Sequence, residues 1–87
     1  MAKVEIYTTR WCPYCHMAKR LLKKKDIAFS EIDVGGDAEL RRRMVQRAGG
    51  GHTVPQIFID DRSVGGCDEL HALDAVGDLN RMLGVVA

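Results

Sequence analysis

The stretch RWCPYCHMAKRLLKKK, residues 10–25, places two cysteines three positions apart where a predicted strand gives way to a predicted helix. Before it, alternating β-forming residues predict a strand over residues 3–8. After Pro13, apolar residues recur at helical spacing, which predicts a helix that continues to Lys25. Because proline favours the first position of a helix, Cys12 is expected at the N-cap.

The remaining segments alternate between strand and helix patterns. We expect a strand over 27–34, a helix from Asp37 to the glycines at 49–51, strands at 56–59 and 62–66 joined as a hairpin, and a helix from Cys67 that breaks at Gly77 before a short helix around 79–83. The right-handed crossover of the first β-α-β unit makes its strands parallel. The prediction is an α/β fold, a small mixed sheet with helices on both faces. The cysteine pair falls at the carboxyl end of a parallel strand, where sites gather.

Length and composition set limits on the function. The 87 residues predict a single domain, and the net charge of +1 gives no reason to expect nucleic-acid binding. No apolar run approaches the roughly 20 residues that cross a membrane. The first residues lack the apolar segment of a secretory signal, so a cytoplasmic protein is expected. The basic runs at 19–25 and 41–47 are interpreted as solvated helix faces.

The three cysteines are an odd number, which in a reducing compartment favours catalytic, redox or metal use over a disulfide scaffold. A thiolate at Cys12 gains hydrogen bonds from the first helical turn and the favourable end of the helix dipole. Cys15 lies one turn on, close enough to bond to Cys12 but more deeply set. Cys12 is therefore the predicted nucleophile, and Cys15 the resolving thiol that displaces a mixed disulfide.

Two other roles for the pair fit the sequence less well. A zinc site usually takes four ligands in paired spacing, whereas this chain has one C-x-x-C with Cys67 and three histidines scattered elsewhere. A permanent structural disulfide is unusual in a cytosolic chain. A C-x-x-C that follows a strand and opens a helix is the context typical of a redox pair, and no metal is expected.

The Val54–Pro55 bond precedes the third predicted strand and is a candidate for the cis isomer. A cis bond would turn the Val54 backbone outwards, where its N–H and C=O could pair with an extended, peptide-like substrate. The alternative, an ordinary proline that begins a strand, is equally compatible with the spacing.

The segment GGCD, residues 65–68, opens the third predicted helix. Its free N–H groups suit a carboxylate and Asp68 suits an ammonium, so together they would bind an amino-acid terminus. The residues by themselves favour the plainer alternative, an Asp that caps the helix. Cys67 is interpreted as a small semi-buried residue rather than a third redox partner.

The motifs CPYC (12–15), TVP (53–55) and GGCD (65–68), in this order and spacing, resemble those of glutaredoxins. The chain looks most similar to the small bacterial dithiol glutaredoxins of the class-three type. The resemblance implies a thioredoxin fold with a four-stranded mixed sheet. It also implies a glutathione-dependent thiol-disulfide oxidoreductase that reduces protein disulfides and glutathione mixed disulfides through Cys12 and Cys15.

The resemblance also implies roles for other residues. The glutathione-binding residues would be Tyr14 beside the ligand, Thr53 and Val54 on its cysteinyl backbone through the cis-Pro55 loop, Gly66, Cys67 and Asp68 at its γ-glutamyl end, and Arg41 at its glycine carboxylate. Many relatives carry lysine where this chain has Thr9, and threonine where it has Trp11. Trp11 would either form a partner-binding surface or shield the thiol.

The expected partners are glutathione and proteins that are glutathionylated or hold disulfides, with ribonucleotide reductase as a candidate target. No membrane or nucleic-acid partner is expected, and the chain is expected to act as a monomer. Three alternatives stay open: a redoxin reduced by a flavoenzyme, a protein that holds an iron–sulfur cluster between Cys12 and glutathione from two subunits, and a pure interaction domain.

Overall fold

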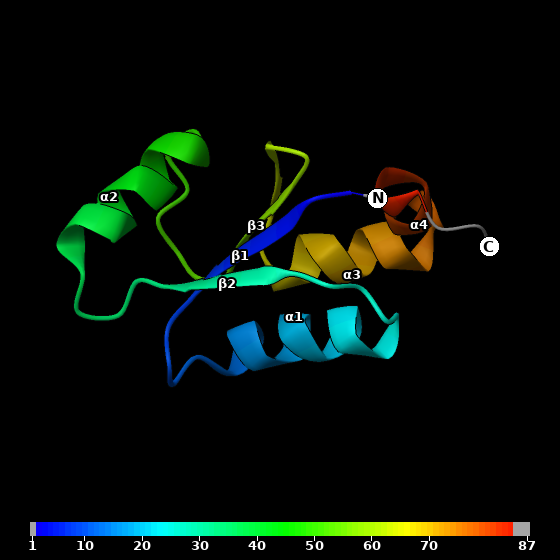
Figure 1. The fold of residues 1–87 in the computed structure, drawn as a ribbon, viewed down its shortest axis with the longest axis horizontal. Helices are drawn as coiled ribbons and strands as arrows, with labels where there is room; N and C mark the ends of the chain where they lie inside the picture. Colours follow the sequence, from blue (N-terminus) through cyan, green and yellow to red (C-terminus); the bar gives the residue numbers. More distant parts are fainter. Residues whose placement is uncertain (1, 85–87) are drawn as a thin grey trace.

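The structure, a computed structural model, describes residues 2–84 (Figure 1). Its elements follow in the order β1 (Val4–Thr8), α1 (Pro13–Lys24), β2 (Ser30–Asp33), α2 (Ala38–Arg47), β3 (Gln56–Ile59), β4 (Arg62–Gly65), α3 (Cys67–Ala75) and α4 (Asp78–Leu83). The strands form one sheet in the order β2-β1-β3-β4. β1 pairs with β2 in parallel, whereas β3 is antiparallel to both β1 and β4. The predicted α/β fold with a small mixed sheet is confirmed.

Helices cover both faces of this sheet, and strand alternation explains why. In β1, Ile6 and Tyr7 point to opposite faces, as successive strand residues must. Ile6 packs with Leu22 of α1 and Leu70 of α3. The helices α1 and α3 lie side by side on this face of the sheet (Figure 1). On the other face, under α2, the buried residues are Tyr7, Val34, Met44 and Phe58. The sheet is thus the middle layer of three.

β2 is shorter than the sequence predicts. The pattern indicated a strand over residues 27–34, but the paired strand covers only Ser30–Asp33. The preceding residues instead complete the end of α1: Asp26 has a φ of +62°, and the N–H of Ile27 donates to the carbonyl of Leu22 at 2.9 Å. Residues 27 and 29 still pack against the core, which accounts for their apolar character.

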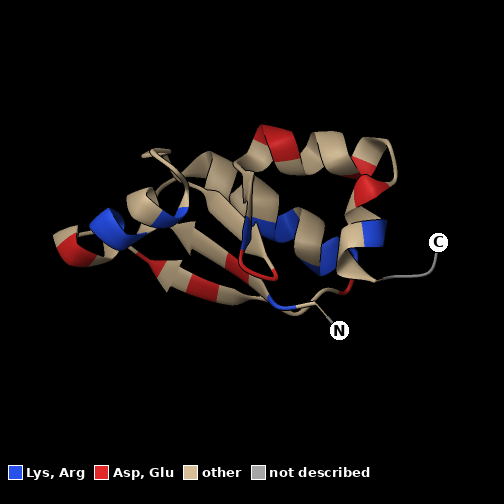
Figure 2. Ribbon diagram, turned by 90° about the horizontal axis from the view of Figure 1, so that it is seen from above, with Lys and Arg blue, Asp and Glu red and all other residues tan. Residues whose placement is uncertain are grey.

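The basic runs are only partly solvated faces. Figure 2 shows Lys and Arg along α1 and α2, and acidic residues on α3. Arg41, Arg42 and Arg43 are exposed as expected. Arg47, however, is half-buried and bonds to Glu5 of β1, so for this residue the interpretation was wrong. No helix in residues 2–84 has the length and apolar character that crossing a membrane requires.

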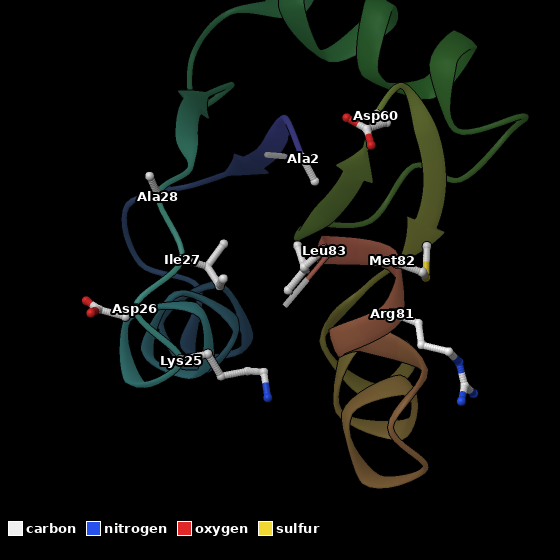
Figure 3. Close-up of a pocket in the computed structure, with 10 residues that line it drawn as sticks. Ala2, Lys25, Asp26, Ile27, Ala28, Asp60, Arg81, Met82 and Leu83 are labelled. Carbon is white, nitrogen blue, oxygen red and sulfur yellow. The ribbon is translucent and has the colours of Figure 1, made fainter. Parts of the chain in front are cut away.

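A cavity of about 640 Å³ lies between the end of α1 and α4 (Figure 3). Ile27 and Leu83 face each other across it, and Ala2 and Met82 also line it. None of the predicted site residues belongs to this cavity, which is therefore separate from the cysteine pair.

Candidate active site

Cys12 occupies the N-cap of α1, as predicted, with Pro13 as the first helical residue. Its sulfur accepts a hydrogen bond from the backbone N–H of Cys15 at 3.3 Å. The same sulfur lies 3.6 Å from the carbonyl oxygen of Val54, to which the thiol donates. The N–H of Cys15 and the N-terminal end of the α1 dipole therefore place partial positive charge beside the Cys12 sulfur.

Cys15 is fully buried, whereas Cys12 is only half-buried. Burial raises the pKa of Cys15 to about 12, and the contact with Cys12 acts in the same direction. Cys15 is therefore a neutral thiol near pH 7, and the sulfur that an incoming disulfide can reach is that of Cys12. This difference suits a pair in which Cys12 attacks the substrate disulfide and Cys15 then resolves the mixed disulfide.

The Val54–Pro55 peptide bond is cis, which confirms the sequence expectation. The loop before it is held by Gln56, whose side-chain N–H donates to the carbonyl of Thr53 at 2.9 Å. A Cβ on Gly66 would lie 3.2 Å from the carbonyl oxygen of Pro55, so the turn before α3 approaches this loop closely. The absence of a side chain at residue 66 permits that approach.

The N-terminus of α3 is closed by a residue that the sequence analysis did not single out. The carboxylate of Glu69 accepts the N–H of Gly66, the N-cap, at 2.7 Å. The plainer interpretation of Asp68 as the cap is therefore wrong: Asp68 is exposed in the first turn. The signal was present, because an acid three residues after an N-cap commonly reaches back to it.

Cys67 follows Gly66 and is buried, as the semi-buried interpretation expected. Its sulfur lies 3.4 Å from Nδ1 of His71, one turn along α3. Burial raises the pKa of the Cys67 thiol, and nearby Asp68 adds to the effect. The thiol of Cys67 is therefore held in its neutral form.

These segments enclose a groove of about 300 Å³. Its lining residues are Tyr14, Thr53, Val54, Pro55, Gly66, Cys67, Asp68 and Glu69. All of the predicted binding residues except Arg41 are brought together here. Arg41 is exposed on α2, and its guanidinium donates to the carbonyl of His52 at 3.1 Å, next to the loop that forms one wall.

The residues that lead into the site are exposed. Trp11 keeps 84% of its surface accessible, so it does not shield the thiol. The guanidinium of Arg10 lies 5.8 Å from the centre of the Trp11 ring. Among residues 2–84, no three His, Cys, Asp or Glu side chains gather closely enough to hold a metal ion. The site can carry out thiol-disulfide exchange beside a groove that offers free N–H groups and a carboxylate.

Comparison with known proteins gives consistent matches. The family model for glutaredoxin matches residues 4–64. The chain is 54% identical to Glutaredoxin 3 of Escherichia coli over 83 residues, which cover 95% of this chain and 99% of that protein. It is 52% identical to a glutaredoxin of Pseudomonas aeruginosa over 83 residues, covering 95% of this chain and 98% of the other.

Solved structures agree with the sequence matches. The solution structure of a glutaredoxin from Brucella melitensis has a TM-score of 0.84 and 47% identity, covering 100% of this chain and 96% of that one. The crystal structure of a buckwheat glutaredoxin–glutathione complex has a TM-score of 0.85 and 25% identity, covering 99% of this chain and 83% of the other. The similarity therefore extends over nearly the whole chain in each case.

Proposed function

The chain belongs to the glutaredoxin family, and from that premise we propose that the groove beside Cys12 binds the glutathione half of a mixed disulfide. The fold is the thioredoxin fold. The protein is a glutathione-dependent thiol-disulfide oxidoreductase, which acts on protein disulfides and glutathione mixed disulfides through Cys12 and Cys15 with glutathione as reductant. The observation that carries the proposal is that the groove extends from the nucleophile's neighbour Val54 to the N-terminus of α3.

The α3 end of the groove offers partners for both charged groups of the γ-glutamyl end of glutathione. The N–H of Gly66 is taken by Glu69, so the backbone N–H groups of Cys67 and Asp68 in the first turn of α3 would bind the γ-glutamyl carboxylate, as a helix N-terminus favours an anion. Asp68 supplies a carboxylate for the ammonium of the γ-glutamyl group. The buckwheat relative is described as a glutathione complex, which supports the same ligand here.

The middle of the ligand is proposed to lie along the cis-Pro55 loop. Thr53 and Val54 would pair with the cysteinyl backbone, and Tyr14 would form the side wall beside Cys12. Arg41 would bind the glycine carboxylate from the open side of the groove. Its guanidinium has five N–H donors, so the bond to His52 leaves others for this carboxylate.

The reaction of a glutathionylated protein begins when the Cys12 thiolate attacks the glutathione sulfur. The protein thiolate leaves and takes a proton from solvent, while Cys12 is left bound to glutathione. The thiolate of a second glutathione then attacks this mixed disulfide, which releases oxidised glutathione and restores Cys12. Cys15 takes no part in this route.

A protein disulfide needs both cysteines. Cys12 attacks one sulfur, and the other leaves as a thiolate that is protonated by solvent. Cys15 then loses its proton and attacks the Cys12 sulfur, which forms the Cys12–Cys15 disulfide and releases the second substrate thiol. Two glutathione molecules reduce the enzyme disulfide and become oxidised glutathione.

The oligomeric state, the location and the protein substrates are also proposals. We infer that the chain acts as a single-domain monomer in the cytoplasm, with glutathionylated or disulfide-containing proteins as substrates and ribonucleotide reductase among the candidates. Three free cysteines, two of them buried, suit a reducing compartment.

The test of the groove compares Asp68→Asn with Asp26→Asn in the glutathione-coupled reduction of a small glutathione mixed disulfide. Asp26 is an exposed control at the end of α1, and its φ of +62° is one that asparagine tolerates. We expect Asp68→Asn to raise KM about tenfold with little change in kcat, because a charged hydrogen bond is lost. The control should match the wild type. An unchanged KM for Asp68→Asn would remove Asp68 from the ligand site.

A further inference from the structure

Exposed apolar side chains gather around the nucleophile. Trp11, Tyr14 and Met17 are 84%, 56% and 44% exposed, and they lie in the loop before Cys12 and in the first five residues of α1. The other large hydrophobic side chain found exposed in residues 2–84 is Val76, which lies beyond the end of α3. We call Trp11, Tyr14 and Met17, with the adjacent Arg10, the Trp11 patch.

The Trp11 patch continues the glutathione groove but is distinct from most of it. Tyr14 lines the groove, whereas Trp11, Met17 and Arg10 do not. A ligand that fills the groove therefore leaves the Trp11 side of the nucleophile free. Larger exposed apolar patches that are rimmed by polar residues mark protein–protein interaction sites.

The charge of the patch indicates what it binds. No acidic residue occurs from Thr9 to Lys25, and Arg10 places its guanidinium over the Trp11 ring. The Arg10 backbone is held by His16, whose Nε2 lies 3.1 Å from the Arg10 carbonyl oxygen. The acidic side chains of Asp68 and Glu69 line the groove itself. A carboxylate beside the attacked cysteine of a protein substrate is thus favoured on the Trp11 side, near Arg10.

We propose that the Trp11 patch docks protein disulfide substrates in which the reactive cysteine is flanked by an apolar side chain and a carboxylate. Trp11 covers the apolar side chain and Arg10 pairs with the carboxylate. Tryptophan and arginine are the side chains that most often dominate the free energy of protein–protein binding. The inference rests on the reduction of protein disulfides and is independent of the assignment of the glutathione groove.

The test uses two synthetic peptides without tryptophan, each closed by one disulfide. One peptide carries Phe and Glu beside the attacked cysteine, and the other carries Ser and Lys. Trp11→Thr should lower kcat/KM for the Phe/Glu peptide about tenfold, and for a small glutathione mixed disulfide less than twofold. Val76→Thr removes an exposed apolar side chain away from the site and should change neither value.

The charge is tested separately. Arg10→Gln should reduce the preference for the Phe/Glu peptide about fivefold, and the wild-type preference should weaken as salt is raised. Arg20→Gln is the matched control, because Arg20 is also exposed on this basic stretch but lies a turn beyond the patch. Equal effects of the two substitutions would mean that only overall charge matters, and docking through Arg10 would be wrong.

Trp11 is the single tryptophan of the chain, so its fluorescence reports the docking directly. Cys15→Ser prevents resolution and traps the mixed disulfide with each peptide. The emission of Trp11 should shift to shorter wavelength with the Phe/Glu peptide and stay unchanged with the Ser/Lys peptide. An unshifted emission with both, or a Trp11→Thr loss that is equal for peptide and glutathione substrates, overturns the proposal.

Discussion

The backbone N–H of Cys15 points at the sulfur of Cys12 from 3.3 Å, so the second cysteine helps to hold the first in its reactive position. The side chains of the two residues meet opposite surroundings. Cys15 has no exposed surface, whereas Cys12 is half-buried at the helix end. Two thiols one turn apart therefore differ in accessibility, and burial raises the pKa of Cys15.

The first prediction concerns the division of labour between these cysteines. Cys12→Ser should abolish glutathione-coupled turnover of every substrate, because no other thiol is accessible at the site. Cys15→Ser should retain the reduction of a glutathione mixed disulfide and lose that of a protein disulfide. Steady-state assays of both substrates test this. If the wild type were inactive with glutathione but accepted electrons from a flavoenzyme reductase, the redoxin alternative would hold instead.

The second prediction concerns the pH dependence of stability. The unfolded chain releases the Cys15 proton near pH 9, whereas burial in the folded chain raises the pKa of Cys15 to about 12. Unfolding in this window therefore releases a proton, and the free energy of unfolding falls as pH rises. Between pH 8 and 10 the wild type should lose about 1 kcal/mol more than Cys15→Ser. Urea unfolding of both reduced proteins measures the difference; parallel curves would contradict it.

The third prediction concerns Arg47, whose guanidinium bonds to Glu5 and the Tyr7 hydroxyl, each at 3.0 Å. The guanidinium also lies 4.1 Å from the centre of the Phe58 ring. A lysine cannot make these contacts together, so Arg47→Lys should lower the free energy of unfolding by about 1–2 kcal/mol. Arg42→Lys is the control.

Arg42 is 65% exposed and pairs only with Glu39 on its own helix. Its replacement should change stability by less than about 0.5 kcal/mol. Urea midpoints of the two variants decide the matter. Equal losses in the free energy of unfolding would show that the planar guanidinium of Arg47 adds no stability beyond that of an exposed ion pair.

The fourth prediction concerns Gly65, which has a φ of +97° and lies against Glu69. A Cβ there would come within 2.8 Å of the Glu69 carboxylate oxygen. Gly65→Ala should therefore displace the carboxylate that caps α3, lower the free energy of unfolding by about 2 kcal/mol or more, and raise KM for glutathione mixed disulfides.

Gly36 provides a control that separates the cost of a positive φ from the cost of steric crowding. Its φ is +74°, but a Cβ there meets nothing within 4 Å. Gly36→Ala should cost only about 1 kcal/mol, with no change in KM. Thermal or urea unfolding together with the coupled assay compares the two variants. A Gly65→Ala protein that matched Gly36→Ala in both readouts would exclude the contact with Glu69.

Much of this architecture follows from local sequence. The N-cap position of Cys12 follows from Pro13, and the short hairpin follows from the apolar run before Asp60 and Asp61. The gathering of the groove residues follows from topology, because the loop after β1, the cis-Pro55 loop and the start of α3 meet at the same end of the sheet.

Features that depend on distant partners were not predictable in this way. Arg47 lies in a basic run like its exposed neighbours, and only folding brings Glu5, forty-two positions away, beside it. The true start of β2 is decided by hydrogen bonding. The N–H of Ile27 donates to the Leu22 carbonyl at the end of α1, and the chain joins the sheet only at Ser30. The apolar pattern is the same in either arrangement.

The exposure of a single thiol means that the two kinds of substrate compete for the protein. Because Cys15 and Cys67 are buried, every substrate must be attacked by the Cys12 sulfur. A glutathionylated protein and a protein disulfide must therefore exclude each other, even where they contact different walls of the site. Each is a competitive inhibitor of the other's reduction. A surge of one substrate would slow repair of the other with no change in the amount of enzyme.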